Sequence, residues 1–271
     1  AAGCSKESCE GCANNQNAGG IKKEPMNAAS RIRKVIGVIS GKGGVGKSFV
    51  TVSLACAMQK AGYRVGIMDA DITGPSVPKM LGLHGQVYGT EDGMVPMEAE
   101  NGIKVMSVNL ILEDEGAPVI WRGPVIAGVV KQFWNETVWG DLDYLFVDMP
   151  PGTGDVPLTV FQSLPVDGVV IVTSPQELVQ MIVEKAYNMA QMMQIPVLGI
   201  VENFSYLKCP DCGKEIRLFG ESKADEAAER LGVPVIARLP LDPAFAQKAD
   251  EGAFASMDVS YLQKGVDLLK S

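Results

Sequence analysis

Glycines and lysines follow the first β-branched segment of the chain with the spacing of a phosphate-binding loop. Residues 41–48 satisfy the pattern G-x-x-x-x-G-K-[ST]. Glycines let backbone N–H groups converge on phosphate oxygens at a helix N-terminus, while Lys47 would reach the terminal phosphates and Ser48 would hold magnesium. A glycine-rich turn that matches by chance is the alternative, which the expected strand before and helix after it disfavour. The candidate nucleotide-binding residues are Gly41, Lys42, Gly43, Gly44, Val45, Gly46, Lys47 and Ser48.

Acidic residues end two of the expected strands and add a second element of the same chemistry. Asp148 closes the apolar run Tyr144–Asp148 and precedes a Pro-Pro-Gly-Thr-Gly segment at 150–154. This order would place a carboxylate near magnesium and a glycine-hinged loop near the γ-phosphate. Asp69 ends another expected strand and Asp71 follows it, at the edge of the sheet where magnesium and an attacking water need oxygen ligands. A solvated turn is the alternative for this pair. Together with the phosphate loop, these residues predict nucleotide hydrolysis.

Five of the six cysteines fall into two tight groups. Cys4, Cys9 and Cys12 lie near the start of the sequence, and Cys209 and Cys212 enclose a Pro-Asp pair. In a chain of 271 residues without a recognisable secretion signal, such grouping indicates metal ligation or redox chemistry before structural disulfides. We therefore expect reduced thiols and a cytoplasmic location.

Seven β-branched runs alternate with helical stretches and would position these residues. Most runs are apolar along their length, as strands covered on both faces must be, and the alternation implies a mostly parallel sheet with right-handed crossovers. The expected strands are Val35–Ser40, Arg64–Asp69, Ile103–Val108, Tyr144–Asp148, Gly168–Thr173, Val197–Val201 and Val233–Arg238. The expected helices are Lys47–Ala61, Gly123–Val138, Pro175–Met193, Glu221–Leu231 and Val259–Lys270. The sequence thus predicts one α/β domain over residues 31–271, with helices on both faces of the sheet and a Cys-x-x-Cys loop at about 203–220.

Composition sets off the first 30 residues and limits the classes of function. Residues 1–30 contain no aromatic side chain and include a polar Asn-Asn-Gln-Asn run, so we expect a flexible, cysteine-bearing tail. The 32 acidic residues outnumber the 24 basic ones, and the net charge of -8 disfavours nucleic acid and anionic lipid as partners. No apolar run reaches the roughly 18 residues of a membrane span, so we expect no membrane-spanning segment.

Five motifs in a fixed order resemble those of the Mrp/ApbC family of iron-sulfur cluster carrier ATPases, relatives of the septum-site protein MinD. They are the phosphate loop at 41–48 with its additional Lys42, the segments 69–76, 121–124 and 148–155, and the Cys209-Pro-Asp-Cys212 motif. The resemblance extends from residue 31 to the end of the sequence. It implies a P-loop NTPase fold of the deviant, MinD-like group.

The resemblance also implies an ATP-binding homodimer with facing nucleotide sites. Lys42 would reach across to the phosphates bound by the partner subunit, while Lys47 and Ser48 act within their own subunit. Asp71 would orient the attacking water, and Asp148 would support Mg²⁺ from the second coordination shell. The positions that correspond to adenine contacts are Asn203 and, in the segment Leu239-Pro240, Pro240.

For the cysteines, the resemblance implies a 4Fe–4S cluster shared between subunits. Cys209 and Cys212 offer two thiolates, so symmetric pairing of two chains would supply the four ligands of a bridging cluster. A zinc clasp would use the same four thiolates and the same spacing. Cys4, Cys9 and Cys12 resemble part of the four-cysteine, ferredoxin-like motif of cytosolic cluster scaffolds, and would hold a second cluster or pass one on.

The leading hypothesis is a dimeric ATPase that binds an iron-sulfur cluster and transfers it to apoproteins. The alternative is a positioning ATPase of the MinD or chromosome-partition type with a structural zinc clasp. Such a protein acts on membrane or DNA, which the acidic composition and the sparsely basic stretch Val259–Lys270 do not favour. An ATP-driven electron donor like the nitrogenase iron protein binds its cluster with isolated cysteines, unlike the pair Cys209 and Cys212.

Overall fold

A mostly parallel sheet forms the centre of the molecule. The computed structural model describes residues 23–71, 76–112, 123–175 and 179–270. The sheet has nine strands in the order β10-β9-β8-β1-β7-β2-β6-β5, with β11 on β9. Its parallel strands are β1 (Arg31–Ile39), β2 (Val65–Asp69), β6 (Lys104–Ser107), β7 (Asp141–Asp148), β8 (Gly168–Thr173), β9 (Val197–Lys208) and β11 (Val235–Pro240). The antiparallel strands are β5 (Met97–Glu98) and β10 (Glu215–Ile216), and β3 (Tyr88–Thr90) with β4 (Gly93–Val95) forms a separate hairpin.

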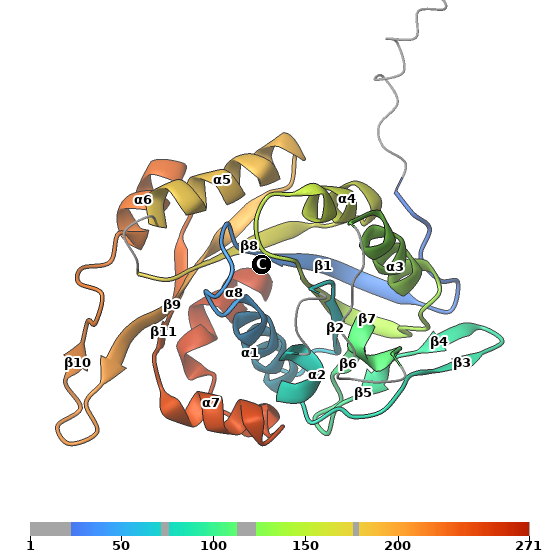
Figure 1. Ribbon diagram of the computed structural model, residues 1–271, viewed down its shortest axis with the longest axis horizontal. Coiled ribbons are helices and arrows are strands. Elements are labelled where there is room, and N and C mark those ends of the chain that lie inside the picture. Colours follow the sequence, from blue (N-terminus) through green and yellow to red (C-terminus); the bar gives the residue numbers. More distant parts are fainter. Residues whose placement is uncertain (1–22, 72–75, 113–122, 176–178, 271) are drawn as a thin grey trace, which may run out of the picture.

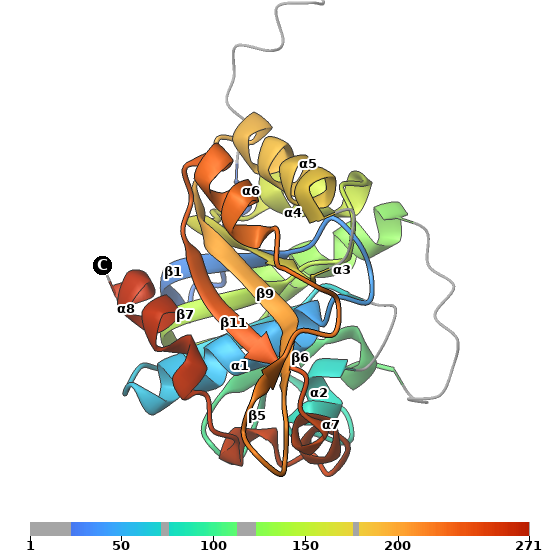
Figure 2. The ribbon, with the colours of Figure 1, turned by 90° about the vertical axis from the view of Figure 1, so that its left-hand side faces the viewer.

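Helices cover both faces of this sheet, as Figures 1 and 2 show. One face carries α1 (Lys47–Lys60), α2 (Ser76–Met80), α7 (Pro243–Asp250) and α8 (Gln263–Lys270). The other carries α3 (Gly123–Asn135), α4 (Asp155–Ser163), α5 (Val179–Met192) and α6 (Ala224–Leu231). Each layer encloses its own cluster of buried apolar side chains. Among the described helices, none is both long and apolar enough to cross a membrane.

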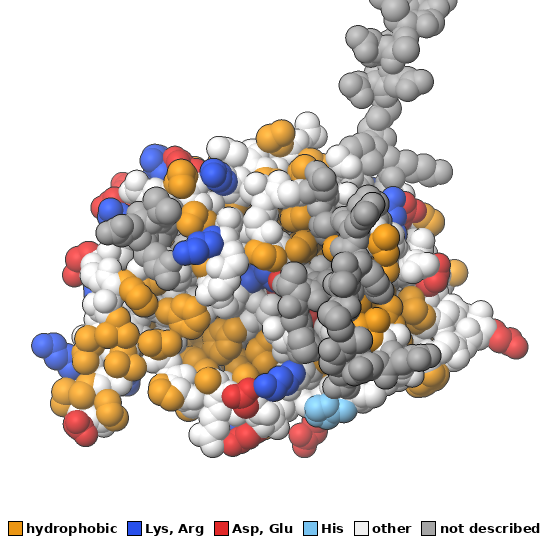
Figure 3. Space-filling view, viewed as in Figure 1, with side chains coloured by type: hydrophobic (Ala, Val, Ile, Leu, Met, Phe, Trp, Pro, Cys, Tyr) orange, Lys and Arg blue, Asp and Glu red, His pale blue; other side chains and the backbone are white. Residues whose placement is uncertain are grey.

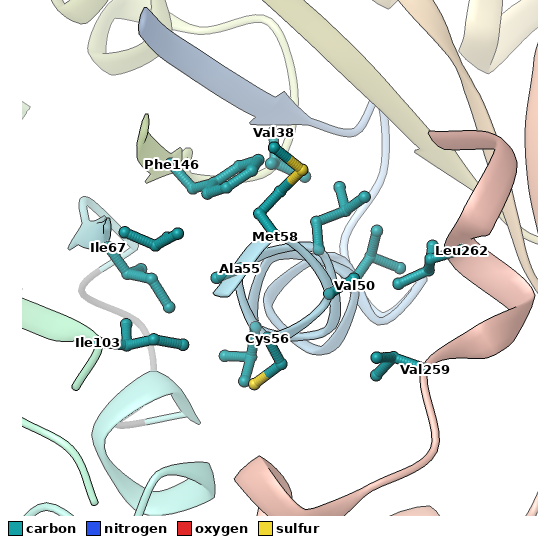
Figure 4. Close-up of a cluster of buried hydrophobic side chains, with 14 of the residues drawn as sticks. Val38, Val50, Ala55, Cys56, Met58, Ile67, Ile103, Phe146, Val259 and Leu262 are labelled. Carbon is teal, nitrogen blue, oxygen red and sulfur yellow. The ribbon is translucent and has the colours of Figure 1, made fainter. Parts of the chain in front are cut away.

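Helix α1 lies in the middle of its layer and fixes the position of the phosphate loop. Its side chains are buried from Val50 to Met58, and Figure 4 shows them between sheet residues and the C-terminal segment that carries Val259 and Leu262. Cys56 belongs to this core, and burial raises the pKa of its thiol to about 11, so it is a packing residue. Because α1 is packed along its length, Lys47 and Ser48 at its start are held rigidly.

The fold class expected from the sequence is confirmed, and the seven expected strands and five expected helices are all present. The main differences lie where polar residues interrupt the apolar pattern. Strand β9 continues to Lys208, beyond the expected end at Val201, and the last helix begins at Gln263 after a short 3₁₀ turn. Helices α2, α4 and α7 and the short strands β3, β4, β5 and β10 were not expected.

Residues 23–30 lie against the domain, although the sequence analysis assigned them to the tail. The backbone N–H of Glu24 donates to the carbonyl of Ser163, and the indole of Trp134 donates to the carbonyl of Glu24 at 3.0 Å. The Glu24 carboxylate also pairs with Lys131 of α3 at 2.9 Å. The part of the expected tail that is outside the described residues is therefore 1–22, which includes Cys4, Cys9 and Cys12.

Candidate functional site

A cavity of about 540 Å³ opens where the carboxyl ends of the parallel strands meet the helices α1, α2 and α7. Its one end is formed by the phosphate loop, with Lys47, Ser48 and Asp71. Its other end is formed by Asn203 of β9 and by residues 240–250, which end β11 and form α7. Lys47 and Asp71 supply charge at the first end, whereas Leu241 and Phe245 supply apolar surface at the second. This combination suits a nucleotide, because the phosphates require charged partners and the base requires apolar contacts.

The phosphate loop adopts its conformation through glycine. Gly44 and Gly46 both have φ of +78°, a region that other residues rarely adopt. A Cβ at Gly46 would overlap with the Asn203 side-chain amide, whose Nδ2 donates to the Val45 carbonyl at 3.0 Å. Glycine is therefore required at position 46 both for the backbone angle and for the approach of β9 to the loop.

The eight residues of the loop do not all face the cavity. Five of them line it, namely Gly43, Gly44, Gly46, Lys47 and Ser48. Gly41 packs against the backbone of Ile182 in α5, and Val45 is buried. Lys42 is exposed and is not among the described residues that line the cavity of its own subunit.

Lys47 stands at the centre of a group of buried charges. Its Nζ lies 2.8 Å from Asp148 Oδ1 and 3.3 Å from Asp71 Oδ2, and Thr51 Oγ1 donates to the same Asp148 oxygen at 2.8 Å. Burial disfavours the ammonium, but the carboxylates of Asp148, Asp71 and Asp69 outweigh burial and raise the pKa of Lys47. The lysine is therefore charged, and both carboxylates expected from the sequence lie beside it.

Asp69 is a third carboxylate close to Lys47. It is buried, accepts from Ser107 Oγ at 2.9 Å, and accepts from the backbone N–H of Asp71 at 3.1 Å. Burial and the nearby charge of Asp148 raise the pKa of Asp69 well above its ordinary value. Strand pairing explains the proximity, since Asp69 lies opposite both Asp148 and Ser107 in the sheet.

The far end of the cavity contains both expected base-contacting positions and several residues that the sequence analysis missed. Asn203 and Pro240 line it as expected. Phe204, Leu241 and Phe245 also line it. The Asp242-Pro243 pair that caps α7 was a usable signal for this helix, because Asp at the N-cap and Pro at the first turn commonly start one.

Three buried oxygens near the cavity have no hydrogen-bond partner among the residues that the structure describes. They are Asp148 Oδ2, Asn203 Oδ1 and Ser40 Oγ. Buried polar atoms are normally paired, so unpaired ones in a cavity indicate a ligand or ordered water. Asp148 Oδ2 and the hydroxyl of Ser48 suit Mg²⁺ or its water ligands, because this ion prefers oxygen donors. Asn203 Oδ1 suits a donor N–H group.

Cys209 and Cys212 lie in the turn between β9 and β10. The hairpin is closed by Cys209 N–H donating to the Lys214 carbonyl and by Gly213 N–H donating to the Cys209 carbonyl, both at 2.9 Å. Backbone N–H groups of Cys212 and Asp211 also donate to the Cys209 sulfur and lower the pKa of its thiol. Hydrogen bonds to sulfur stabilise the thiolate, which is the form that binds metals.

This hairpin leaves both thiols accessible. Cys209 is half-buried, Cys212 is exposed, and both are free thiols. Figure 1 shows the hairpin projecting from the body of the molecule beyond the helices. Over the described ranges, no three metal-ligating side chains converge, so the hairpin offers two thiols and no third candidate ligand from these ranges. The segments 72–75 and 121–122 and the tail cysteines lie outside the described residues.

Known proteins have sequences similar to this chain over most of their length. The iron-sulfur cluster carrier protein of Clostridium perfringens is 44% identical over 263 residues, covering 90% of this chain and 92% of that protein. The protein of the same name from Methanocaldococcus jannaschii is 48% identical over 225 residues, covering 82% and 78%.

Solved structures agree with the fold. The nucleotide-binding protein of Archaeoglobus fulgidus in complex with ADP is 44% identical, with a TM-score of 0.76 over 84% of this chain and 89% of that chain. The cell division ATPase MinD of Pyrococcus furiosus, 22% identical with a TM-score of 0.61 over 88% and 98%, shares the fold. The family model described as NUBPL iron-transfer P-loop NTPase, of the ParA group, matches residues 31–266. The chain therefore belongs to this family of iron-transfer P-loop NTPases, as its resemblance to the cluster carrier ATPases implied.

Proposed function

We propose that this protein is a homodimeric ATPase of the cytoplasm that carries a 4Fe–4S cluster and transfers it to apoproteins. The main observation behind this proposal is that one strand, β9, connects the nucleotide cavity to the cysteine hairpin. Strand β9 contributes Asn203 and Phe204 to the nucleotide cavity and, five residues further on, enters the hairpin with Cys209. Curated relatives at 44% and 48% identity bear the name iron-sulfur cluster carrier protein, which supports the same assignment.

The nucleotide is ATP in this proposal. The unpaired Asn203 Oδ1 would accept a hydrogen bond from the amino group of adenine, whereas the carbonyl of guanine at the same place would repel it. The Archaeoglobus fulgidus relative is described with ADP bound, which agrees with an adenine nucleotide. Phe245 and Ala246 of α7 supply the apolar wall that a base requires.

The buried charges around Lys47 give each residue a role in hydrolysis. Lys47 would transfer its ionic contacts from Asp71 and Asp148 to the terminal phosphates when ATP binds. Asp71, released from the lysine, would accept a hydrogen bond from the attacking water and orient it. Ser48 would hold Mg²⁺ and Asp148 would bind the water ligands of this ion, which offsets phosphate charge when it is bound.

Lys42 would complete the site of the partner subunit. Its exposure, and its absence from the described residues that line the cavity of its own subunit, support this role. In the proposal, Lys42→Ala impairs hydrolysis more than nucleotide binding. Mixing this variant with Asp71→Ala should restore activity in heterodimers that contain one intact composite site, and confirmed heterodimers without activity would count against action across the dimer.

The cluster would lie between two hairpins. Each hairpin offers two thiols, Cys209 and Cys212, and a 4Fe–4S cluster takes four thiolates, so two copies related by a twofold axis complete the set. Exposed apolar side chains flank the cysteines, and a second copy would cover them. They are Ile216 (41% exposed), Leu218 (51%) and Phe219 (51%), on the side where Figure 3 shows apolar side chains gathered.

Variants of the cysteine hairpin and of the phosphate loop test cluster binding and ATP hydrolysis separately. After anaerobic reconstitution, we expect the Cys209→Ala/Cys212→Ala variant to lose bound iron and sulfide while keeping ATP binding, and Lys47→Ala to lose ATP hydrolysis. The loaded parent should transfer its cluster to an apoprotein whose visible absorbance reports a 4Fe–4S centre. One zinc per dimer, with no iron bound after reconstitution, would instead favour the positioning ATPase with a zinc clasp.

A further inference from the structure

A buried glutamate, Glu202, directly precedes the cavity residue Asn203 in strand β9, which runs on into the cysteine hairpin. The Glu202 side chain has no exposed surface. Its carboxylate accepts from Ser205 Oγ at 2.6 Å and from Ser222 Oγ at 2.5 Å, and it lies 3.6 Å from Arg238 Nε. Burying a carboxylate is costly without partners, so three polar partners around one buried group indicate a specific structural task.

These contacts close the base of the hairpin that carries the cysteines. Ser205 precedes Cys209 by four residues, and Ser222 follows the hairpin directly before α6. Ser222 is placed firmly, because its hydroxyl also accepts from the backbone N–H of Ala224 at 3.1 Å. The carboxylate of Glu202 therefore joins the strand that enters the hairpin to the segment that leaves it.

The same stretch of β9 contacts the phosphate loop. Asn203 donates to the Val45 carbonyl, and the next residue, Phe204, lines the cavity with φ of +57°, which is uncommon for a bulky side chain. Successive strand residues normally face opposite sides, yet Asn203 and Phe204 both line the cavity. The pairing of β9 with β11 shifts register at this point, between Arg238 and Pro240.

We propose that Glu202 is a positioning residue that makes nucleotide binding in the cavity and cluster binding at the hairpin depend on each other. A ligand that moves Asn203 or Phe204 must move the backbone next to Glu202, and the carboxylate passes this movement to both arms of the hairpin. Such coupling is reciprocal, so a cluster on Cys209 and Cys212 must change nucleotide affinity by the same factor. The inference rests on the proposed function, because it assumes that both ligands bind.

The decisive experiment measures this factor in the full chain. A fluorescent, non-hydrolysable ATP analogue is titrated anaerobically into cluster-free and cluster-loaded protein. We expect the two affinities of the parent to differ by at least about fivefold, the lower end of typical coupling between sites. In Glu202→Gln and in Ser222→Ala the ratio should fall below about twofold, while the cluster-free affinity stays within about threefold of the parent. Ser222→Ala removes one hydroxyl only, so it tests the proposal even where Glu202→Gln does not fold.

Two matched variants serve as controls. Glu184→Gln removes a carboxylate that pairs with Arg230 at 2.6 Å between α5 and α6, and Ser260→Ala removes a hydroxyl that donates to Asp258 at 3.1 Å. Both should keep the coupling of the parent. If Glu202→Gln and Ser222→Ala also keep it, or if a parent that binds both ligands shows no coupling, the proposal is wrong.

A second readout needs no cluster. Hydrogen exchange of residues 206–221 should slow when the analogue binds to the cluster-free parent, and this slowing should be absent in Ser222→Ala. Equal slowing in both proteins would overturn the role of the Glu202 contacts. A parent that binds the analogue but no cluster would refute the proposed function, whereas the exchange measurement would still decide the inference.

Discussion

Replacing Lys47 by alanine should destabilise the protein even without nucleotide. Lys47 and Asp148 are both buried, and their charged atoms lie 2.8 Å apart. Removing one partner of a buried pair leaves an uncompensated charge, which typically costs about 3–5 kcal/mol. In urea, with a slope of about 3 kcal/mol per molar, the unfolding midpoint should fall by about 1–1.7 M.

The chain offers a matched control for this change. Lys79 pairs with Asp250 at 2.6 Å, also beside the cavity, but both side chains are more than half exposed. Exposed pairs contribute about 0.2–1 kcal/mol, so Lys79→Ala should shift the urea midpoint only slightly. Equilibrium unfolding of nucleotide-free, chelator-treated protein at pH 7 measures both variants.

The dependence on pH supplies a second check. Burial and the neighbouring Asp148 already raise the pKa of Asp69, and loss of the Lys47 ammonium should raise it further. A carboxyl whose pKa is higher in the folded than in the unfolded state lowers the free energy of unfolding, and this effect is complete at pH above the folded-state pKa. The effect decreases as the pH falls toward the pKa of the unfolded state, which is about 3.9 for Asp. The stability gap between parent and Lys47→Ala should therefore narrow from pH 7 to pH 5. A gap no larger than that of Lys79→Ala, or one that widens on acidification, would refute the reasoning.

Three further predictions concern the walls of the cavity, the phosphate loop and the cysteine hairpin. Asn203→Ala should weaken ATP binding about tenfold by calorimetry, because it removes the bond to the phosphate loop and the acceptor for the base; unchanged affinity would remove Asn203 from the site. Gly46→Ala should abolish ATP binding and lower the melting temperature, because the added Cβ would overlap with the Asn203 side chain. Gly62 also has a positive φ but open space around it, so Gly62→Ala should lower the melting temperature alone. Similar nucleotide affinity in the two variants would contradict the overlap with Asn203. The Cys209 thiol should be alkylated at lower pH than an ordinary cysteine, because N–H groups lower its pKa; mass spectrometry of Cys209 peptides over a pH series checks this, and an ordinary profile would count against the hydrogen bonds.

The phosphate end of the site could be predicted from the sequence because it depends on local rules. The glycine spacing of residues 41–48 determines the loop, and the carboxyl ends of parallel strands meet at one edge of a sheet. Asp71 and Asp148 therefore lie beside Lys47 as expected, although they are 77 positions apart in the sequence. The alternation of apolar strands and helices was similarly sufficient for the fold class.

The far end of the cavity, around Asn203 and Phe204, depends on tertiary contacts that no local sequence pattern encodes. The same holds for the contacts of Glu202 where β9 enters the cysteine hairpin. The polar residues after Val201 predict the end of a strand, but β9 continues to Lys208. The Glu202 carboxylate is stabilised there by Ser222 and Arg238, which are distant in sequence. The positive φ of Phe204 likewise has no sequence signature, since non-glycine residues adopt it only where their surroundings impose it. Residues 23–30 looked like a tail because their few anchoring contacts are made with helices that follow much later.

Native mass spectrometry of anaerobically reconstituted protein tests the central claim most directly. The proposal predicts one species that contains two chains and a single 4Fe–4S cluster, and this species should disappear in the Cys209→Ala/Cys212→Ala variant while nucleotide-bound chains remain. A cluster carried by a single chain, or a bridged dimer that persists without both cysteines, would contradict the claim.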